Sequence, residues 1–212
     1  MNTRPAPSYG LSQRLLEYAA IGSFVFLAGW SVWRLFQICS LYFVPVALSI
    51  AVCAWLAVDL LSGLLHFAFD SWGSVHTTLI GNTFIRPFRE HHVHPQEMTR
   101  HDFIELNGAS SLACLPVLGV AAVLPLTSMV WMVVQAALLF VALGAFVTNL
   151  CHKWAHTEPV LTPRLIRWAQ HYRLILSPAH HRLHHTTPFN SHFCMTNGWL
   201  NQPLNAWLRL WR

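Results

Sequence analysis

Apolar side chains fill long stretches of the chain, and charged side chains are confined to the segments between them. A helix needs about 20 apolar residues to cross the hydrocarbon core of a bilayer. Charge-free windows run over residues 18–33 and 35–58, and a longer one over 106–151 has room for two passes. The pattern predicts four membrane-spanning helices in two hairpins, over about 15–36, 40–66, 107–125 and 129–150.

Two local features adjust these limits. The first window is slightly short, and we expect a further turn at either end as Arg14 and Arg34 extend toward the interfaces. The break inside the long window is predicted at residues 124–128, where proline and small polar residues permit a tight turn. The alternative is a two-span protein whose first apolar stretches form a buried, soluble hairpin.

The composition agrees with a membrane location. Hydrophobic residues make up 54% of the 212 residues and charged residues 10%, with a mean hydropathy of +0.42. A typical soluble domain carries about 25% charged residues, and an aromatic content of 13% excludes a disordered chain. We therefore predict an all-α integral membrane protein that forms one domain over residues 1–212.

The charges predict an orientation. With four spans, both termini and the loop near 70–105 share one side, which carries every Lys and Arg except Arg34. The positive-inside rule makes this side cytoplasmic, and we expect a bacterial inner-membrane protein. The net charge of +5 contains no basic run that would follow phosphates, so no nucleic-acid partner is predicted. Five scattered cysteines predict neither disulfides nor a thiolate metal site.

Fourteen histidines are unusual in so apolar a chain, and those with regular spacing lie in segments 66–105 and 151–212 on the predicted cytoplasmic side. His152 and His156 are four residues apart and lie on one face of a helix, as do His181, His184 and His185. Imidazole nitrogens suit Zn, Cu, Fe and Ni. Solvated or pH-sensing histidines are the alternative.

The number of histidines exceeds the four ligands of a structural zinc and the three of a catalytic zinc. Eight can supply about four nitrogens to each of two ions: His66, His91, His92, His152, His156, His181, His184 and His185. Two redox metals beside a membrane point to dioxygen activation. Four carboxylates lie nearby in the sequence and are expected to orient the rings: Asp70, Glu90, Asp102 and Glu105. Asp70 could also bind a metal directly, and plain ion pairs are equally open for Glu90 and Glu105.

These motifs resemble the plasmanylethanolamine desaturase family, the Kua or lipid desaturase group, with the plant chloroplast trans-3-palmitate desaturase as a more distant relative. The resemblance spans about residues 58–208. The matching segments are SGLLH at 62–66, FIRPFREHH at 84–92, TRHDFIELNG at 99–108, TNLCHKWAH at 148–156, HHRLHH at 180–185 and CMTNGWLNQPL at 194–204.

The resemblance implies an oxygen-dependent enzyme with two non-haem Fe ions. It would form the vinyl-ether double bond of plasmalogens from alkyl-ether phospholipids, using O2 and an electron donor such as cytochrome b5 or ferredoxin. Carried over residue by residue, the ligands are the same eight histidines, with His101, His180 and Asp70 in reserve. Arg86 and Arg89 either hold the lipid phosphate or anchor the chain at the cytoplasmic face.

Several positions depart from the family pattern: His94, Ala109, His192 and residues 170–173. They leave open the headgroup and chain of the substrate. An acyl-chain desaturase or hydroxylase acting close to the headgroup is the alternative enzyme. A membrane metal transporter or haem-binding protein is the alternative of a different class. A transporter should carry ionisable ligands near the bilayer midplane, and a haem needs only one or two axial histidines.

The charge distribution generates a topology prediction. Reporter fusions after Arg212 and at Thr127 should report opposite sides of the membrane, with Arg212 in the cytoplasm, because 12 of the 13 basic residues share that side. The measurement is the activity of a compartment-specific reporter. A periplasmic or lumenal signal after Arg212 would contradict the four-span arrangement.

Overall fold

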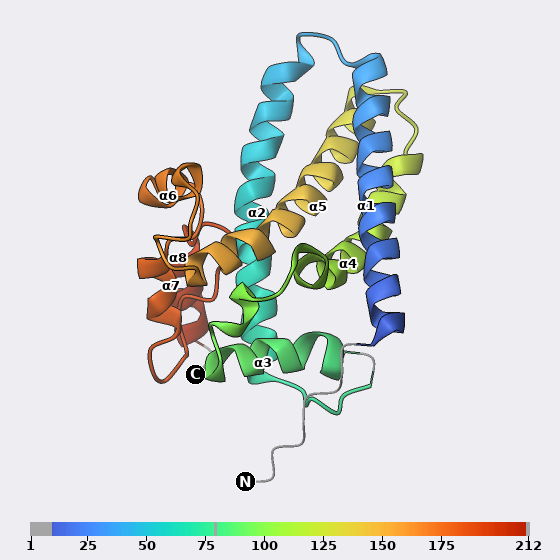
Figure 1. Cartoon of the computed structure of the whole chain (residues 1–212). Helices are drawn as coiled ribbons and strands as arrows, with labels where there is room; N and C mark the ends of the chain where they lie inside the picture. Colours follow the sequence, from blue (N-terminus) through green and yellow to red (C-terminus); the bar gives the residue numbers. More distant parts are fainter. Residues whose placement is uncertain (1–9, 79, 211–212) are drawn as a thin grey trace.

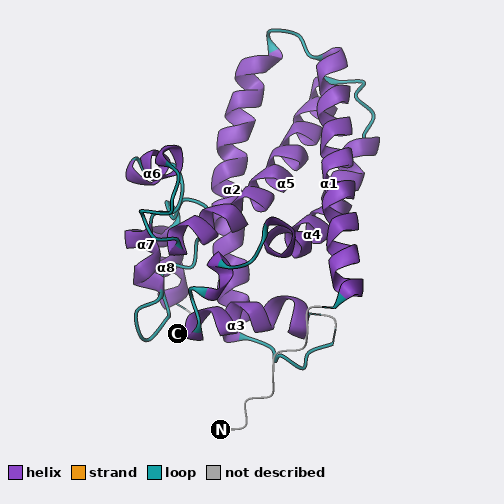
Figure 2. Cartoon of the chain, viewed as in Figure 1, coloured by secondary structure: helices purple, strands orange, loops and turns teal. Residues whose placement is uncertain are grey.

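A computed structural model describes residues 10–78 and 80–210 of the chain. Every regular element among these residues is a helix, as Figure 2 shows, and the all-α fold class is confirmed. Four helices are long and apolar enough to cross a membrane. They are α1 (Leu11–Ile38), α2 (Phe43–Ser71), α4 (Phe103–Val123) and α5 (Met129–His156).

The helices extend beyond the predicted spans where the chain turns polar. Helix α2 continues five residues past position 66, and α5 continues six residues past position 150. The charge-free windows underestimate these ends because the polar residues there face other protein segments rather than lipid. The turn between α4 and α5 covers residues 124–128. Histidine ligand candidates in 66–71 and 151–156 are therefore carried on rigid helix rather than on loops.

Small and aromatic side chains pack the four-helix bundle. Phe24 of α1, Leu118 of α4 and Leu139 of α5 belong to one buried cluster. Gly144 lets α5 approach α2 closely, since a Cβ at this position would lie 3.0 Å from a methyl group of Val58. Such close contact is how helices associate in lipid, where burial of apolar surface gives little driving force.

Arg34, the one basic residue assigned to the far side, has a structural role. Its guanidinium donates hydrogen bonds to the carbonyls of Ala122 (2.6 Å) and Leu124 (2.5 Å). These carbonyls end α4, where the helix itself offers no further N–H partner. The residue that departs from the charge distribution therefore ties the end of α4 to α1.

Short helices lie on the side of the bundle where α5 ends, most of them near the lower end of α2 and α6 beside its middle (Figure 1). They are a π-helical turn (Gly81–Ile85), α3 (Arg86–Val93), a 3-10 turn (Glu97–Thr99), α6 (Arg164–His171), α7 (Pro178–His184) and α8 (Asn201–Arg209). Ser177 begins α7 by accepting a hydrogen bond from the backbone N–H of His180, and Pro178 follows at the first helical position.

The short helices and the segments between them, residues 81–99 and 164–209, are called the cap below. A buried carboxylate joins the cap to the four-helix bundle. Asp59 of α2 is fully buried and accepts hydrogen bonds from four backbone N–H groups of the segment before α8, at 2.9–3.2 Å: Thr196, Asn197, Gly198 and Leu200. One turn further on, a Cβ at Gly63 would lie 2.7 Å from both Cys194 Sγ and Leu204 Cδ2. Segment 193–204 is therefore held directly against α2.

We predict that Asp59→Leu destabilises the cap. The change leaves four buried N–H groups without an acceptor, and each such group costs about 1–3 kcal/mol. Thermal unfolding in detergent should start at a lower temperature, and limited proteolysis should cleave within 186–200. The matched control is Leu60→Ala, one residue along the same helix at a side chain that is 37% exposed. Equal unfolding temperatures for the two variants would contradict this role of Asp59.

Candidate metal centre

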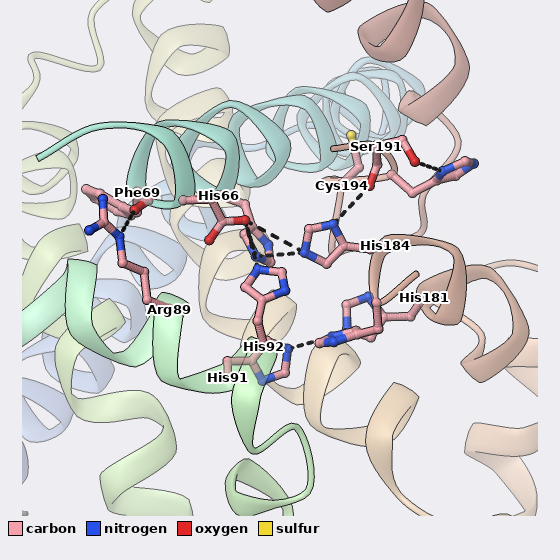
Figure 3. Close-up of polar contacts among 12 residues, drawn as sticks. His66, Phe69, Arg89, His91, His92, His181, His184, Ser191 and Cys194 are labelled. Carbon is pink, nitrogen blue, oxygen red and sulfur yellow. Dashed lines mark hydrogen bonds and ion pairs between the residues drawn. The ribbon is translucent and has the colours of Figure 1, made fainter. Parts of the chain in front are cut away.

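All eight histidines singled out from the sequence converge at the cap end of α2 and α5, and Figure 3 shows five of them labelled: His66, His91, His92, His181 and His184. Their ring nitrogens and one carboxylate oxygen, that of Asp70, form two groups of donor atoms. Within each group the donor atoms lie within 4.8 Å of one another. Site 1 consists of His91, His152, His156, His181 and His185. Site 2 consists of His66, Asp70, His92 and His184.

The two sites share the same helices. On α3, His91 belongs to site 1 and the adjacent His92 to site 2, because consecutive residues of a helix point about 100° apart. On α7, His181 belongs to site 1 and His184 to site 2, and His185, directly after the helix, belongs to site 1. The sites are consequently neighbours, and the rings of His92 and His185 lie 5.3 Å apart, centroid to centroid.

Helices α2 and α5 each supply an i, i+4 pair to one site. His66 and Asp70 of α2 enter site 2, while His152 and His156 of α5 enter site 1. The i, i+4 spacing places both donors on the same face of the helix, one turn apart. The spacing seen in the sequence thus explains the pairs, whereas the split between sites depends on the directions of α3 and α7.

The site 1 nitrogens surround one point. The Nε2 atoms of His91 and His181 each lie 2.7–3.0 Å from the Nε2 atoms of the other three rings, in six contacts altogether. The rings of His91 and His181 are nearly parallel, with an interplanar angle of 21° and centroids 5.9 Å apart. These two rings therefore lie on opposite sides of the other three.

Hydrogen bonds among the rings cannot account for this arrangement. The Nε2 of a neutral imidazole holds either one proton or one lone pair, so five nitrogens cannot satisfy six mutual contacts. A cation that accepts the five lone pairs removes the conflict, and imidazole is a ligand for Fe, Zn, Cu and Ni. The donor set of site 1 therefore fits a transition-metal ion.

The cap histidines are held in the neutral state that metal binding requires. Burial lowers the pKa of His91 and of His181 well below the usual range. Burial also lowers the pKa of His184 to about 3 and that of His185 to about 4, with a further contribution from His92 in both cases. The lone pairs of these rings are available at neutral pH.

Site 2 combines three imidazoles with a carboxylate. Asp70 Oδ2 lies 2.9 Å from His92 Nε2 and 3.4 Å from His66 Nε2, and the Nε2 atoms of His66 and His184 are 3.2 Å apart. His184 Nδ1 donates to the carbonyl of Ser191 at 2.9 Å, which leaves its Nε2 lone pair facing the site. Asp70 therefore lies among the donor atoms themselves, and an N3O set of this kind also fits a first-row transition metal.

A cavity of about 380 Å³ opens on site 2. Asp70 and His92 line it together with Arg89 and the aromatic rings of Phe189 and Phe193. Pro188, Phe189 and Phe193 form an apolar wall of this cavity beside the candidate metal ligands, and such a wall suits a substrate with a hydrocarbon chain.

Three carboxylates predicted to orient the rings have other partners. Glu90 pairs with Arg86, and Glu105 lies 3.5 Å from His101. Asp102 caps α4 by accepting from two backbone N–H groups and pairs with Arg14, which together lower the pKa of Asp102 to about 2. These contacts lie outside both sites, because the three side chains belong to the outward faces or ends of their helices.

The reserve histidines also lie outside the two groups. His180 Nε2 lies 2.9 Å from the side-chain nitrogen of Asn201, and the backbone carbonyl of His101 accepts a hydrogen bond from Lys153. The Arg89 guanidinium donates to the carbonyls of Phe69, Trp72 and Gly73 at 3.0–3.2 Å, and so closes the end of α2 while also lining the cavity. The roles of Arg86 and Arg89 toward a lipid stay predictions.

Two contributors to the site were missed from the sequence. Asp59 was visible there as a single carboxylate in an otherwise apolar helix, which is a costly placement that signals a specific partner. The Ser191 carbonyl, which orients His184, is a backbone atom, and no residue type identifies it.

The fold and the site together define a helical membrane protein with a polyhistidine centre whose donor atoms fit metal ions. Residues 55–212 match the lipid desaturase domain family, and the chain belongs to this family. It is accordingly a lipid desaturase, an oxidoreductase that acts on membrane lipids. The family resemblance drawn from the histidine motifs is confirmed.

The chain is similar to several named proteins over most of its length. It is 41% identical over 204 residues to the plasmanylethanolamine desaturase of Myxococcus xanthus, covering 94% of this chain and 70% of the relative. It is 40% identical over 173 residues to plasmanylethanolamine desaturase 1 of Mus musculus, covering 79% and 63%. It is 30% identical over 152 residues to the chloroplastic fatty acid desaturase 4 of Arabidopsis thaliana, covering 71% and 45%. No solved structure matches the chain significantly.

The two donor groups generate a prediction about metal content. His156→Ala should lower the metal bound at site 1, and His184→Ala that at site 2, each losing about one of two ions per chain by elemental analysis. Both variants should still insert in the membrane, because the apolar spans form without the metal. The control is His76→Ala, an exposed residue in the loop before α3. Equal metal content in all three variants would contradict the assignment of the sites.

Proposed function

We propose that this chain is an oxygen-dependent di-iron desaturase that forms the vinyl-ether double bond of plasmalogens from alkyl-ether phospholipids. The observation that carries the proposal is the pair of adjacent donor groups, sites 1 and 2, joined through α3 and α7 beside a cavity that two phenylalanine rings help to line. The plasmanylethanolamine desaturases of Myxococcus xanthus and Mus musculus, each at least 40% identical, support the same substrate class.

The reaction removes two hydrogens from adjacent carbons of the alkyl chain. One O2, two electrons from an external donor and two protons are consumed, and two water molecules leave with the alkene. Two bound iron ions would supply the activation of O2 that an unreactive C–H bond requires. The ligands we propose are the five histidines of site 1 and the three histidines of site 2, with Asp70 as a ninth donor.

The residues around site 2 have the arrangement that this chemistry needs. The hydrogen bond to Ser191 holds the ring of His184 in one tautomer, and the aromatic rings of Phe189 and Phe193 form an apolar wall of the cavity beside site 2. Arg89 lines the same cavity, so it is the arginine we favour for the lipid phosphate. The C1–C2 bond of an ether lipid lies at headgroup depth, which agrees with ligands at the ends of spanning helices.

The electron donor and the orientation belong to the same proposal. We propose a donor such as cytochrome b5 or ferredoxin on the cytoplasmic side, and a location in a bacterial inner membrane, as suits a relative from Myxococcus xanthus. The positive-inside distribution supports cytoplasmic termini. The terminal residues 1–9 and 211–212 lie outside the described residues.

An acyl-chain desaturase is the second candidate, favoured by the similarity to the chloroplastic fatty acid desaturase 4 proteins of Arabidopsis thaliana. The same donor groups would serve a bond near the carboxyl end of an acyl chain. A hydroxylase would share the oxidant and differ in the product. The lipid desaturase family match argues against a haem protein or a metal transporter.

We predict that cells which make alkyl-ether phospholipids but no plasmalogens gain vinyl ethers when they express this chain. Vinyl ethers are acid-labile, so acid treatment of extracted lipids should release fatty aldehydes, measured by mass spectrometry. The purified protein should contain iron and show no Soret band. The His184→Ala variant should release no aldehydes, since it lacks a donor of site 2.

Each other outcome identifies a different reaction. A trans double bond near the carboxyl end of an acyl chain, without aldehydes, would establish the acyl-chain desaturase. A hydroxylated chain would agree with the proposed oxidant but would show that the product is an alcohol rather than an alkene. One zinc per chain, or a Soret band, would overturn the di-iron proposal.

A further inference from the structure

A phenylalanine in an unfavourable backbone conformation lies beside site 2. Phe189, in the segment between α7 and α8, has a φ of +59°. This left-handed region is sterically unfavourable for a bulky residue and is normally occupied by glycine, asparagine or aspartate. Such conformations persist where the surroundings fix them, and they concentrate at functional sites. A phenylalanine at this position therefore indicates a role for its side chain.

Hydrogen bonds on both sides of Phe189 fix the segment. The N–H of Phe189 donates to the carbonyl of Thr186 at 2.9 Å, and the Thr186 hydroxyl donates to the carbonyl of Arg182 on α7 at 2.9 Å. The N–H of His192, whose φ is +61°, donates to the side chain of Asn205 on α8 at 3.0 Å. The backbone that carries the Phe189 ring is therefore attached to two helices.

The two phenylalanines of the cavity wall have different surroundings. Phe193 is 1% exposed, and its ring packs against His184 and His66 with centroids 5.1 and 6.0 Å apart. It supports rings of site 2 and has little surface left for a substrate. Phe189 is 37% exposed and packs its ring against His92, with centroids 5.2 Å apart. Phe189 is thus the ring of this wall that a bound molecule can contact.

One imidazole separates Phe189 from the donor atoms of site 2. The ring of His92 contacts Phe189, and its Nε2 lies 2.9 Å from Asp70 Oδ2. Arg89 lines the same cavity, and Figure 3 shows Arg89 and Ser191 on opposite sides of His92. A lipid whose phosphate is bound by Arg89 would therefore direct the first carbons of its chain past His92 toward segment 188–193.

We propose that Phe189 is a specificity-determining residue, whose ring contacts the substrate chain just beyond the reacting bond and excludes chains that are branched there. This inference rests on the proposed function, because it takes a lipid chain to enter the cavity beside site 2. The basis is steric, since the backbone that carries the ring is fixed at both ends. One methylene group in an apolar pocket changes selectivity by about 10–200-fold.

Photo-crosslinking tests the position of the chain without turnover. An alkyl-ether phosphatidylethanolamine carries a diazirine on its sn-1 chain, either near the ether oxygen or near the methyl end. Each probe is irradiated with the full-length protein in detergent, without an electron donor. The first probe should label the tryptic peptide 183–209 at residues 188–190, and the second should not. Equal labelling of these residues by both probes, or by neither, would overturn the proposal.

The variant Phe189→Ala tests the discrimination. Unlabelled alkyl-ether lipids with a linear sn-1 chain, or with a methyl branch near the ether oxygen, compete with the first probe. Half-competition of the wild-type protein should need at least about tenfold more branched than linear lipid. Phe189→Ala should bring this ratio close to one, and Phe189→Leu should give an intermediate ratio. The matched control Phe84→Ala, at a phenylalanine outside the cavity lining, should keep the wild-type ratio.

The outcomes separate this proposal from the proposed function. An unchanged ratio in Phe189→Ala, with less bound metal, would show that the ring only shields His92 and would overturn the role in specificity. The expected labelling and ratios, without vinyl ethers in expressing cells, would support the contact with the chain and contradict the proposed reaction.

Discussion

The convergence of nine donor atoms on two small volumes is the constraint on which the rest of the structure depends. Eight rings and one carboxylate are brought together from α2, α3, α5 and the α7 segment, and in site 1 six pairs of ring nitrogens lie 2.7–3.0 Å apart. Such groups lose their hydration and gain too few hydrogen bonds in return. The arrangement fits cations, which would take up these lone pairs, and binding of metal would then be coupled to the folding of the cap.

The short helices of the cap need a second stabilising contact besides the donor atoms of the two sites. Helix α3 has eight residues and α7 has seven, far below the length at which an isolated helix is stable in water. Asp59 supplies this contact by holding segment 196–200 against α2. The Ser191 carbonyl lies between that segment and α7 and orients His184. One buried carboxylate thus supports a ligand that is far from it in the sequence.

The sequence allowed the positions of the helices to be predicted better than their tertiary arrangement. The four spans follow from charge-free windows, and the pairs on α2 and α5 follow from i, i+4 spacing. The division of His91 and His92 between two sites depends on the direction of α3, a tertiary property without a local signal. Proximity in sequence left two roles equally open for Glu90, which pairs with Arg86, and it did not indicate that Asp102 pairs with Arg14.

The two sites differ in charge as well as in number of donors, and the charged donor lies on the side of the centre that faces the cavity. All five donors of site 1 are neutral rings, whereas site 2 contains the only carboxylate of the nine and opens on the cavity. Asp70 places Oδ2 among the ring nitrogens, and its buried Oδ1 has no hydrogen-bond partner among the described residues. A carboxylate oxygen buried without a donor is costly, so it favours a hydrogen-bonding group in that cavity. Site 2 is the side of the centre that faces the cavity, and we infer that substrate is met at site 2 rather than at site 1.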